Sequence, residues 1–151
     1  MIRERIKEET KQAMLTHDSE KLSTLRLISA ALKDKDIAAR PAGKTDGISD
    51  EEILSLLQSM IKQRNESIEM YKKGARQDLV DKEQAEINVI QSFLPQQLSD
   101  EETARIVVET IQAVGASSMK DMGKVMGSLR GKYVGTMDFA KASVLIKEKL
   151  S

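Results

Sequence analysis

The run from Gln63 to Glu102 restricts this chain to helices joined by short corners. Gly74 follows a helical, lysine-rich run, and glycine is the usual residue just beyond a helix end, in the left-handed conformation. Pro95 disfavours the helical conformation of the residue before it, so it ends a helix at about Leu94 and marks a hinge over residues 95–98. The sequence Ser99-Asp100-Glu101-Glu102 is a capping box, the pattern that starts a helix. Three consecutive helices are therefore predicted in this stretch alone.

The composition of the chain fits the same interpretation. Apolar residues make up 40% of the 151 residues, which is enough for a core, but aromatic residues make up only 3%. The core must therefore be aliphatic and rich in methionine. Straight side chains such as those of Met, Lys and Glu lose little rotamer freedom in a helix. No stretch alternates β-branched and polar residues, the pattern of a half-buried strand, so we predict an all-α fold.

Apolar spacing and capping residues predict seven helices in two domains. The predicted helices cover residues 2–16, 19–39, 49–74, 78–94, 99–114, 119–130 and 138–150. The first four form an N-terminal domain of residues 1–95, and the last three form a small C-terminal domain of residues 96–151. Ser49 and Glu52 form a capping box for the third helix, and Asp78 is the predicted N-cap of the fourth.

Basic residues around the predicted corner at 74–78 have structural explanations. Lys72 and Lys73 fall in the last turn of a helix and favour its negative end. Arg76 lies within reach of an acidic side chain near the start of the next helix. Arg26 and Arg64 each interrupt an apolar stripe, so we predict that both form hydrogen bonds between helices.

The C-terminal part of the chain is basic. Residues 115–151 hold seven basic and three acidic residues, a net charge of +4. The candidate nucleic-acid-binding residues around the sixth helix are Lys120, Lys124, Arg130 and Lys132. Such side chains neutralise phosphates without reading sequence, and the glycines between them permit close approach of a backbone. A solvated helix face is the alternative, and Gly123 and Gly127 are predicted to allow close packing against another helix.

Several short motifs, taken in order, resemble those of the YqeY-like proteins. They are Ser23-Thr24-Leu25-Arg26-Leu27, Gln63-Arg64, Glu66-Ser67-Ile68, Lys73-Gly74, Arg76-Gln77-Asp78-Leu79, Glu83, Glu86-Ile87, Phe93-Leu94-Pro95-Gln96-Gln97-Leu98-Ser99 and Met122-Gly123-Lys124-Val125-Met126. The resemblance implies an all-α, two-domain protein similar to the tail domain of the B subunit (GatB) of the glutamine-dependent tRNA amidotransferase. In that enzyme the tail contacts tRNA and catalysis resides in other domains. The resemblance also carries a family label, carbon–nitrogen ligase with glutamine as amido donor.

The residues themselves form no catalytic pattern. His17 is the only histidine and lies in a polar corner, and cysteine is absent, so no nucleophile–base pair, metal site or cofactor is predicted. Charge and resemblance together predict a non-catalytic tRNA-interaction module that works beside amidotransferase or translation components. The alternative is a helical protein–protein adaptor without RNA binding. No secretory signal and no apolar run of about 18–20 residues is visible, so a cytoplasmic protein without membrane contact is expected.

Overall fold

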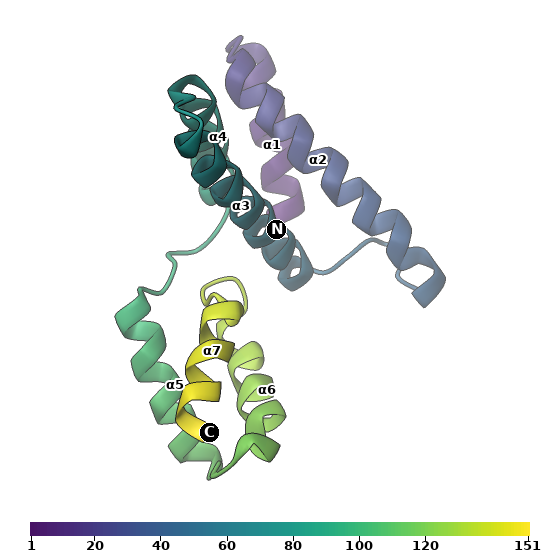
Figure 1. Cartoon of the computed structure of the whole chain (residues 1–151). Coiled ribbons are helices and arrows are strands. Elements are labelled where there is room, and N and C mark those ends of the chain that lie inside the picture. The colour runs from purple at the N-terminus through teal and green to yellow at the C-terminus, as the bar shows by residue number, and fades with distance from the viewer. The chain divides into compact units, whose positions relative to one another are not determined.

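The computed structural model describes residues 1–151, and every regular element in it is helical (Figure 1). The α-helices are α1 (Ile2–Leu15), α2 (Ser19–Ala39), α3 (Asp50–Lys73), α4 (Gln77–Gln91), α5 (Asp100–Val114), α6 (Met122–Tyr133) and α7 (Phe139–Leu150). Two short 3-10 turns, Arg40–Ala42 and Met119–Asp121, lie between them. The predicted all-α class is confirmed. None of these helices has the length and apolar character needed to cross a membrane.

The helices pack into two compact units, Met1–Pro95 and Gln96–Ser151. The N-terminal unit consists of two helical hairpins, α1–α2 and α3–α4 (Figure 1). Its main core is formed by buried aliphatic side chains from all four helices together with Phe93, which is 1% exposed. A separate small cluster of Ile68, Val80 and Ile87 joins α3 to α4. The sequence also predicts that each unit is a separate domain, and this stays a prediction.

An ion pair reinforces the α3–α4 hairpin beside this small cluster. The Arg64 Nε atom donates to Glu86 Oε2 at 2.9 Å, and Arg64 Nη1 donates to the carbonyl of Met60 at 3.1 Å. Both charged side chains are only 14% exposed. The predicted interhelical hydrogen bond of Arg64 is confirmed. Arg26, by contrast, is exposed and forms no side-chain hydrogen bond, so the same prediction is wrong for it.

Both predicted capping boxes are confirmed. Ser49 caps α3 and Ser99 caps α5, and in each case the glutamate three residues later bonds back to the serine N–H. The predicted N-cap of α4 is wrong. Arg76 takes that position, and Asp78 lies in the first turn, where it accepts hydrogen bonds from Arg76 Nε and Nη2 at 3.1 and 2.9 Å.

The corner between α3 and α4 also differs from prediction. Gly74 has φ of −88°, whereas Ala75 has φ of +56° and occupies the left-handed region. The Arg76 N–H bonds to the Tyr71 carbonyl and the Ala75 N–H bonds to the Lys72 carbonyl, the two bonds of a Schellman motif. The left-handed residue of this motif is therefore Ala75, one position later than the predicted Gly74. His17, with φ of +56°, holds the equivalent position after α1.

Replacing Ala75 by glycine should therefore stabilise the chain. A Cβ atom in the left-handed region is unfavourable, and its removal should raise the free energy of unfolding by about 1 kcal/mol. Ala30 is an exposed alanine inside α2, so Ala30→Gly should instead lower it by about 1 kcal/mol. Urea denaturation of both variants measures the difference. Two changes of the same sign would mean that Ala75 is not strained.

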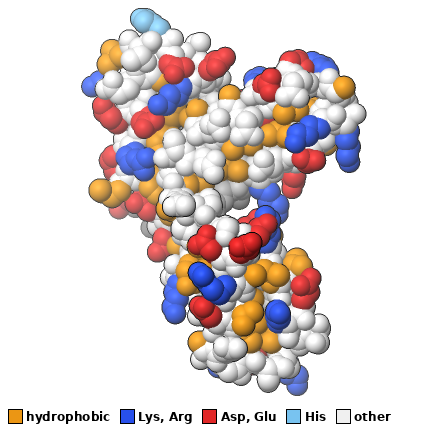
Figure 2. Space-filling view, turned by 90° about the vertical axis from the view of Figure 1, so that its left-hand side faces the viewer, with side chains coloured by type: hydrophobic (Ala, Val, Ile, Leu, Met, Phe, Trp, Pro, Cys, Tyr) orange, Lys and Arg blue, Asp and Glu red, His pale blue; other side chains and the backbone are white.

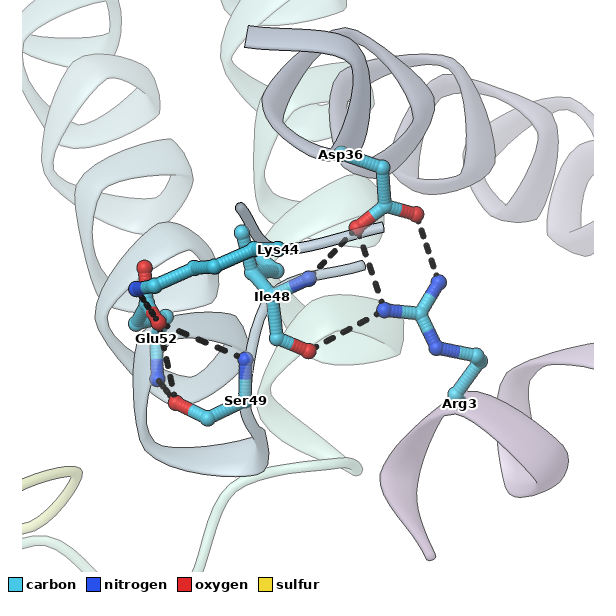
Figure 3. Close-up of polar contacts among 6 residues, drawn as sticks. All are labelled: Arg3, Asp36, Lys44, Ile48, Ser49 and Glu52. Carbon is cyan, nitrogen blue, oxygen red and sulfur yellow. Dashed lines mark hydrogen bonds and ion pairs between the residues drawn. The ribbon is translucent and has the colours of Figure 1, made fainter. Parts of the chain in front are cut away.

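A polar cluster ties the loop before α3 to α1 and α2 (Figure 3). Arg3 pairs with both carboxylate oxygens of Asp36 at 2.6 and 3.1 Å and donates to the Ile48 carbonyl at 3.2 Å. Asp36 also accepts the Ile48 N–H at 2.9 Å. Gly47 is required here, because its φ is +96° and an added Cβ would lie 2.6 Å from Arg3 Nη2. One ion pair thus fixes the course of this loop.

Asp36 should make the stability of the chain sensitive to acid. The hydrogen bond from Arg3, with a smaller contribution from the Ile48 N–H, holds the pKa of Asp36 below its ordinary value. The stabilisation is therefore complete above pH 3.8, the ordinary pKa, and is lost as the pH falls through the lower folded-state pKa. At pH 7, Asp36→Asn should lower the free energy of unfolding by about 1 kcal/mol, a value discounted for partial exposure.

Urea denaturation between pH 7 and pH 2 checks this expectation. The difference between the parent and Asp36→Asn should shrink toward zero at the acid end. Asp46→Asn, an exposed position in the same loop, is the control and should change little at either pH. A difference that stays constant down to pH 2 would show that the Asp36 charge does not stabilise the fold.

The C-terminal unit is a three-helix structure formed by α5, α6 and α7 (Figure 1). Its core contains Val107, Val125, Leu129, Met137 and Ile146. The Leu98 N–H bonds to the Thr136 carbonyl at 2.9 Å and the Gln97 amide to the Gly135 carbonyl at 2.6 Å. These bonds tie the segment just after Pro95 to the turn before α7.

Candidate nucleic-acid interface

The candidate surface is centred on α6 and the 3-10 turn before it. Asp121 fixes the start of this region by accepting the N–H groups of Ser117 and Ser118 at 2.9 and 3.4 Å. Those two hydrogen bonds hold the pKa of Asp121 below its ordinary value. The helix then buries Val125 and Leu129 against α5 and α7. Its opposite face points away from the unit's core.

This outer face of α6 is a row of glycines. Gly123, Gly127 and Gly131 follow one another at intervals of four residues, so they lie along one side of the helix. A Cβ added at any of the three would meet no atom within 4 Å. The prediction that Gly123 and Gly127 allow close packing against another helix of the chain is therefore wrong. The predicted end of this helix at residue 130 is also wrong, because α6 continues to Tyr133.

The four candidate cations are all exposed, and none of them forms an ion pair. Lys124 lies on the outer face beside the glycines, and Lys120 precedes it by four residues in the 3-10 turn. Arg130 and Lys132 are two residues apart, which corresponds to about 200° around a helix axis, so they flank the glycine row on opposite sides. Arg130 lies 6.0 Å from the centre of the Phe139 ring, within cation–π range.

Several basic residues elsewhere are neutralised within the chain. Arg3, Arg64 and Arg76 each pair with a carboxylate at 2.9 Å or less, and Lys141 pairs with Asp100 at 3.1 Å. On the face shown in Figure 2, Lys and Arg side chains alternate with Asp and Glu and form no continuous basic area. What distinguishes Lys120 and Lys124 is the row of exposed glycines beside them, where the helix backbone has no side chains over it.

The α6 surface could accept a phosphate backbone. Phosphate contacts require cations and donors, and a helix side without Cβ atoms lets a bulky, regular backbone come close. No groups of three His, Asp or Glu side chains are placed so that they could hold a metal ion. The arrangement provides charge and shape for binding, and the structure gives no nucleophile–base pair beside it.

The fold and this surface define a small all-helical protein with an exposed, glycine-rich basic helix. The chain matches the family described as Yqey-like protein over residues 3–150, so it belongs to that family. The resemblance seen in its motifs is thereby confirmed.

Relatives include fungal proteins named "Altered inheritance of mitochondria protein 41, mitochondrial". The protein from Pyrenophora tritici-repentis is 30% identical over 135 residues, which cover 86% of this chain and 72% of the relative. The protein from Vanderwaltozyma polyspora is 30% identical over 153 residues, covering 95% and 80%. The protein from Saccharomyces cerevisiae strain YJM789 is 26% identical over 137 residues, covering 87% and 71%.

These names correct one prediction and bear on another. The relatives are named as mitochondrial proteins, which conflicts with the prediction of a purely cytoplasmic location, and that prediction is withdrawn. Neither the family description nor the names of the relatives contain an enzymatic term.

Proposed function

We propose that this protein is a non-catalytic module that binds tRNA or another structured RNA, beside amidotransferase or translation components. The observation that carries the proposal is the open glycine row of α6 with unpaired Lys120 and Lys124 beside it. Arg130 and Lys132 extend the contact to either side. The carbon–nitrogen ligase label of the family would then describe an association with amidotransferase, because the chain's own residues supply no reaction centre.

The shape of this surface favours a folded RNA over a single strand. Proteins that bind single strands stack bases on aromatic side chains, and α6 carries only Tyr133, which is half-buried. Double-stranded RNA is recognised mostly by shape and through phosphates and 2′-hydroxyls. A helix side formed by glycines and bordered by lysines suits that kind of contact.

Binding of total tRNA by the full chain tests the proposal. Filter binding at several salt concentrations gives both the affinity and its salt dependence. Lys120→Ala/Lys124→Ala should weaken binding and make the slope of log affinity against log salt shallower by about 2, one unit for each lost phosphate contact. Arg130→Ala and Lys132→Ala should each have a smaller effect, because they lie at the sides.

Lys7 and Lys11 provide a matched control. They are also exposed lysines four residues apart without ion pairs, but they lie on α1. Lys7→Ala/Lys11→Ala removes the same charge and should leave the affinity nearly unchanged. Equal losses in both double variants would mean that net charge alone drives binding. No salt-dependent binding by the parent would refute the RNA proposal.

The second candidate function is a protein–protein adaptor. Exposed apolar side chains support it, including Leu27 at 43% and Ile37 at 46% exposure on α2. Co-purification of a protein partner that persists after nuclease treatment would favour this function over RNA binding.

A further inference from the structure

The loop between α2 and α3 contains the only Asp-Gly pair of the chain, Asp46-Gly47, and neither asparagine is followed by glycine. In such a pair the backbone nitrogen of the glycine can attack the side-chain carboxyl group of the aspartate, because glycine has no Cβ atom to shield its nitrogen. The product is a five-membered succinimide ring, and this ring can open to an isoaspartyl linkage. The pair is therefore a candidate site of covalent modification.

The Asp46 carboxyl group is free to react. It is exposed, and it forms no hydrogen bond or ion pair within the chain. Every other aspartate lies within a helix or a 3-10 turn, or is the N-cap residue of a helix. A helical backbone has fixed φ and ψ angles, so ring closure at those positions would require local unfolding. Asp46 alone combines an irregular backbone with a free carboxyl group.

The structure also explains why a glycine must follow Asp46. Gly47 has φ of +96°, and an added Cβ would lie 2.6 Å from Arg3 Nη2, so a larger residue would disturb the Arg3–Asp36 ion pair. The same requirement leaves the backbone nitrogen of Gly47 unshielded. Its N–H forms one long hydrogen bond, of 3.3 Å, to the Lys44 carbonyl. The fold thus places a reactive nitrogen beside Asp46.

We propose that Asp46 is a site of isoaspartate formation, and that the modified chain is a substrate for a carboxyl methyltransferase that recognises isoaspartyl groups. The Gly47 nitrogen forms a bond to Cγ of Asp46, while the N–H proton, one carboxyl oxygen and a proton from solvent leave as water. Water then opens the ring. Opening at the side-chain carbonyl restores aspartate, whereas opening at the main-chain carbonyl leaves the peptide bond on Cγ and frees the α-carboxylate. The mass of the chain is unchanged, and the site is independent of the RNA surface on α6.

The isoaspartyl linkage would lengthen a backbone segment that is held at both ends (Figure 3). On the downstream side, the Ile48 N–H bonds to Asp36 at 2.9 Å and the Ile48 carbonyl accepts from Arg3 at 3.2 Å. On the upstream side, Lys44 Nζ pairs with Glu52 at 2.6 Å. The modification adds one carbon atom to the backbone between these contacts, so at least one of them must shift. Modified chains should therefore unfold at a lower urea concentration than unmodified chains.

Prolonged incubation of the native full chain at neutral pH tests this proposal. Trypsin releases Asp46 in the peptide 45–62 and Asp18 in the peptide 12–21, and electron-transfer fragmentation distinguishes aspartate from isoaspartate at equal mass. Asp18-Ser19 is the internal control, because a small residue also follows Asp18 but its carboxylate caps α2 by accepting the Lys21 N–H at 3.2 Å. We expect isoaspartate to accumulate at position 46 and not at position 18. Labelling by an isoaspartyl methyltransferase with radioactive S-adenosylmethionine should rise in parallel.

Two variants of Asp46 complete the test. Asp46→Glu keeps the charge, but its longer side chain would have to close a six-membered ring, which forms much more slowly, so the methyl label and the fall of the denaturation midpoint with incubation time should both disappear. Asp46→Asn should form the same succinimide faster than the parent, because ammonia leaves an amide more readily than water leaves an ionised carboxyl group. The proposal is overturned if the native chain gains no more isoaspartate at position 46 than at position 18 while the urea-unfolded chain does, since the fold would then protect the pair. Methyl labelling that persists in Asp46→Glu would also overturn it.

Discussion

Arg64→Leu is expected to lower the free energy of unfolding by about 2–3 kcal/mol, because it leaves the Glu86 carboxylate without a partner where little water reaches it. Both side chains are 14% exposed, and Arg64 also satisfies the Met60 carbonyl. The ion pair lies between α3 and α4 beside the small cluster of Ile68, Val80 and Ile87. An uncompensated charge at this place opposes the packing of the hairpin.

A double variant distinguishes the cost of leaving Glu86 unpaired from the net contribution of the Arg64–Glu86 ion pair to the free energy of unfolding. Arg64→Leu/Glu86→Leu removes both charges and places two apolar groups beside the existing cluster, so its stability should lie within about 1 kcal/mol of the parent. Urea denaturation of the two single variants and the double variant gives the coupling free energy.

Arg76 provides the control for this experiment. It forms an ion pair with Asp78 at the tip of the same hairpin, at a similar distance of 2.9 Å, but the two side chains are 58% and 65% exposed. Arg76→Leu should leave the denaturation midpoint nearly unchanged, because exposed ion pairs contribute little. If Arg76→Leu and Arg64→Leu had the same effect, burial would not be the cause of the expected loss.

Local features of the fold could be predicted from the sequence. The capping boxes at Ser49 and Ser99 depend on contacts between residues three positions apart, and the structure shows both. The start of α2 was also predictable, because the Asp18 carboxylate accepts the Lys21 N–H only three residues later. Contacts of such short range depend on few other parts of the chain.

Features that depend on what lies opposite a helix could not be predicted in this way. The spacing of Gly123 and Gly127 is the same whether a second helix or solvent covers them, and only the packing of α6 against α5 and α7 decides which face is outside. Arg26 was misread for the same reason. Its place between Leu25 and Ile28 suggested burial, but these two residues face the core whereas Arg26 lies on the exposed side of α2.

The candidate site shows the same limit. The sequence supplied Lys120, Lys124, Arg130 and Lys132 as one cluster, whereas helix geometry places Arg130 and Lys132 on opposite sides of the glycine row.

Gly123→Ala/Gly127→Ala/Gly131→Ala is expected to have opposite effects on stability and on RNA binding. None of the three glycines has a positive φ, and an added Cβ would meet open space at each. Alanine restricts the unfolded chain more than glycine does and favours the helix, so together the substitutions should raise the free energy of unfolding by about 2 kcal/mol. Hydrogen exchange of α6 amides should slow accordingly.

The same three methyl groups should weaken RNA binding. They would stand where the proposed contact requires a bare helix backbone, and they would hold a phosphate backbone away from Lys124 without removing any charge. Binding of tRNA should therefore fall even though the protein is more stable and its net charge is unchanged. This combination separates a surface contact from a general loss of folding, because unfolding would change both properties in the same direction.

Ala113→Gly supplies the reverse control on α5. This exposed alanine lies in the last turn of a helix of the same unit, so its replacement should lower stability and leave RNA affinity unchanged. If the triple alanine variant gains stability and binds tRNA as well as the parent does, RNA does not approach the glycine row. The binding surface would then have to be sought among the flanking cations alone, and the observation on which the proposed function rests would be lost.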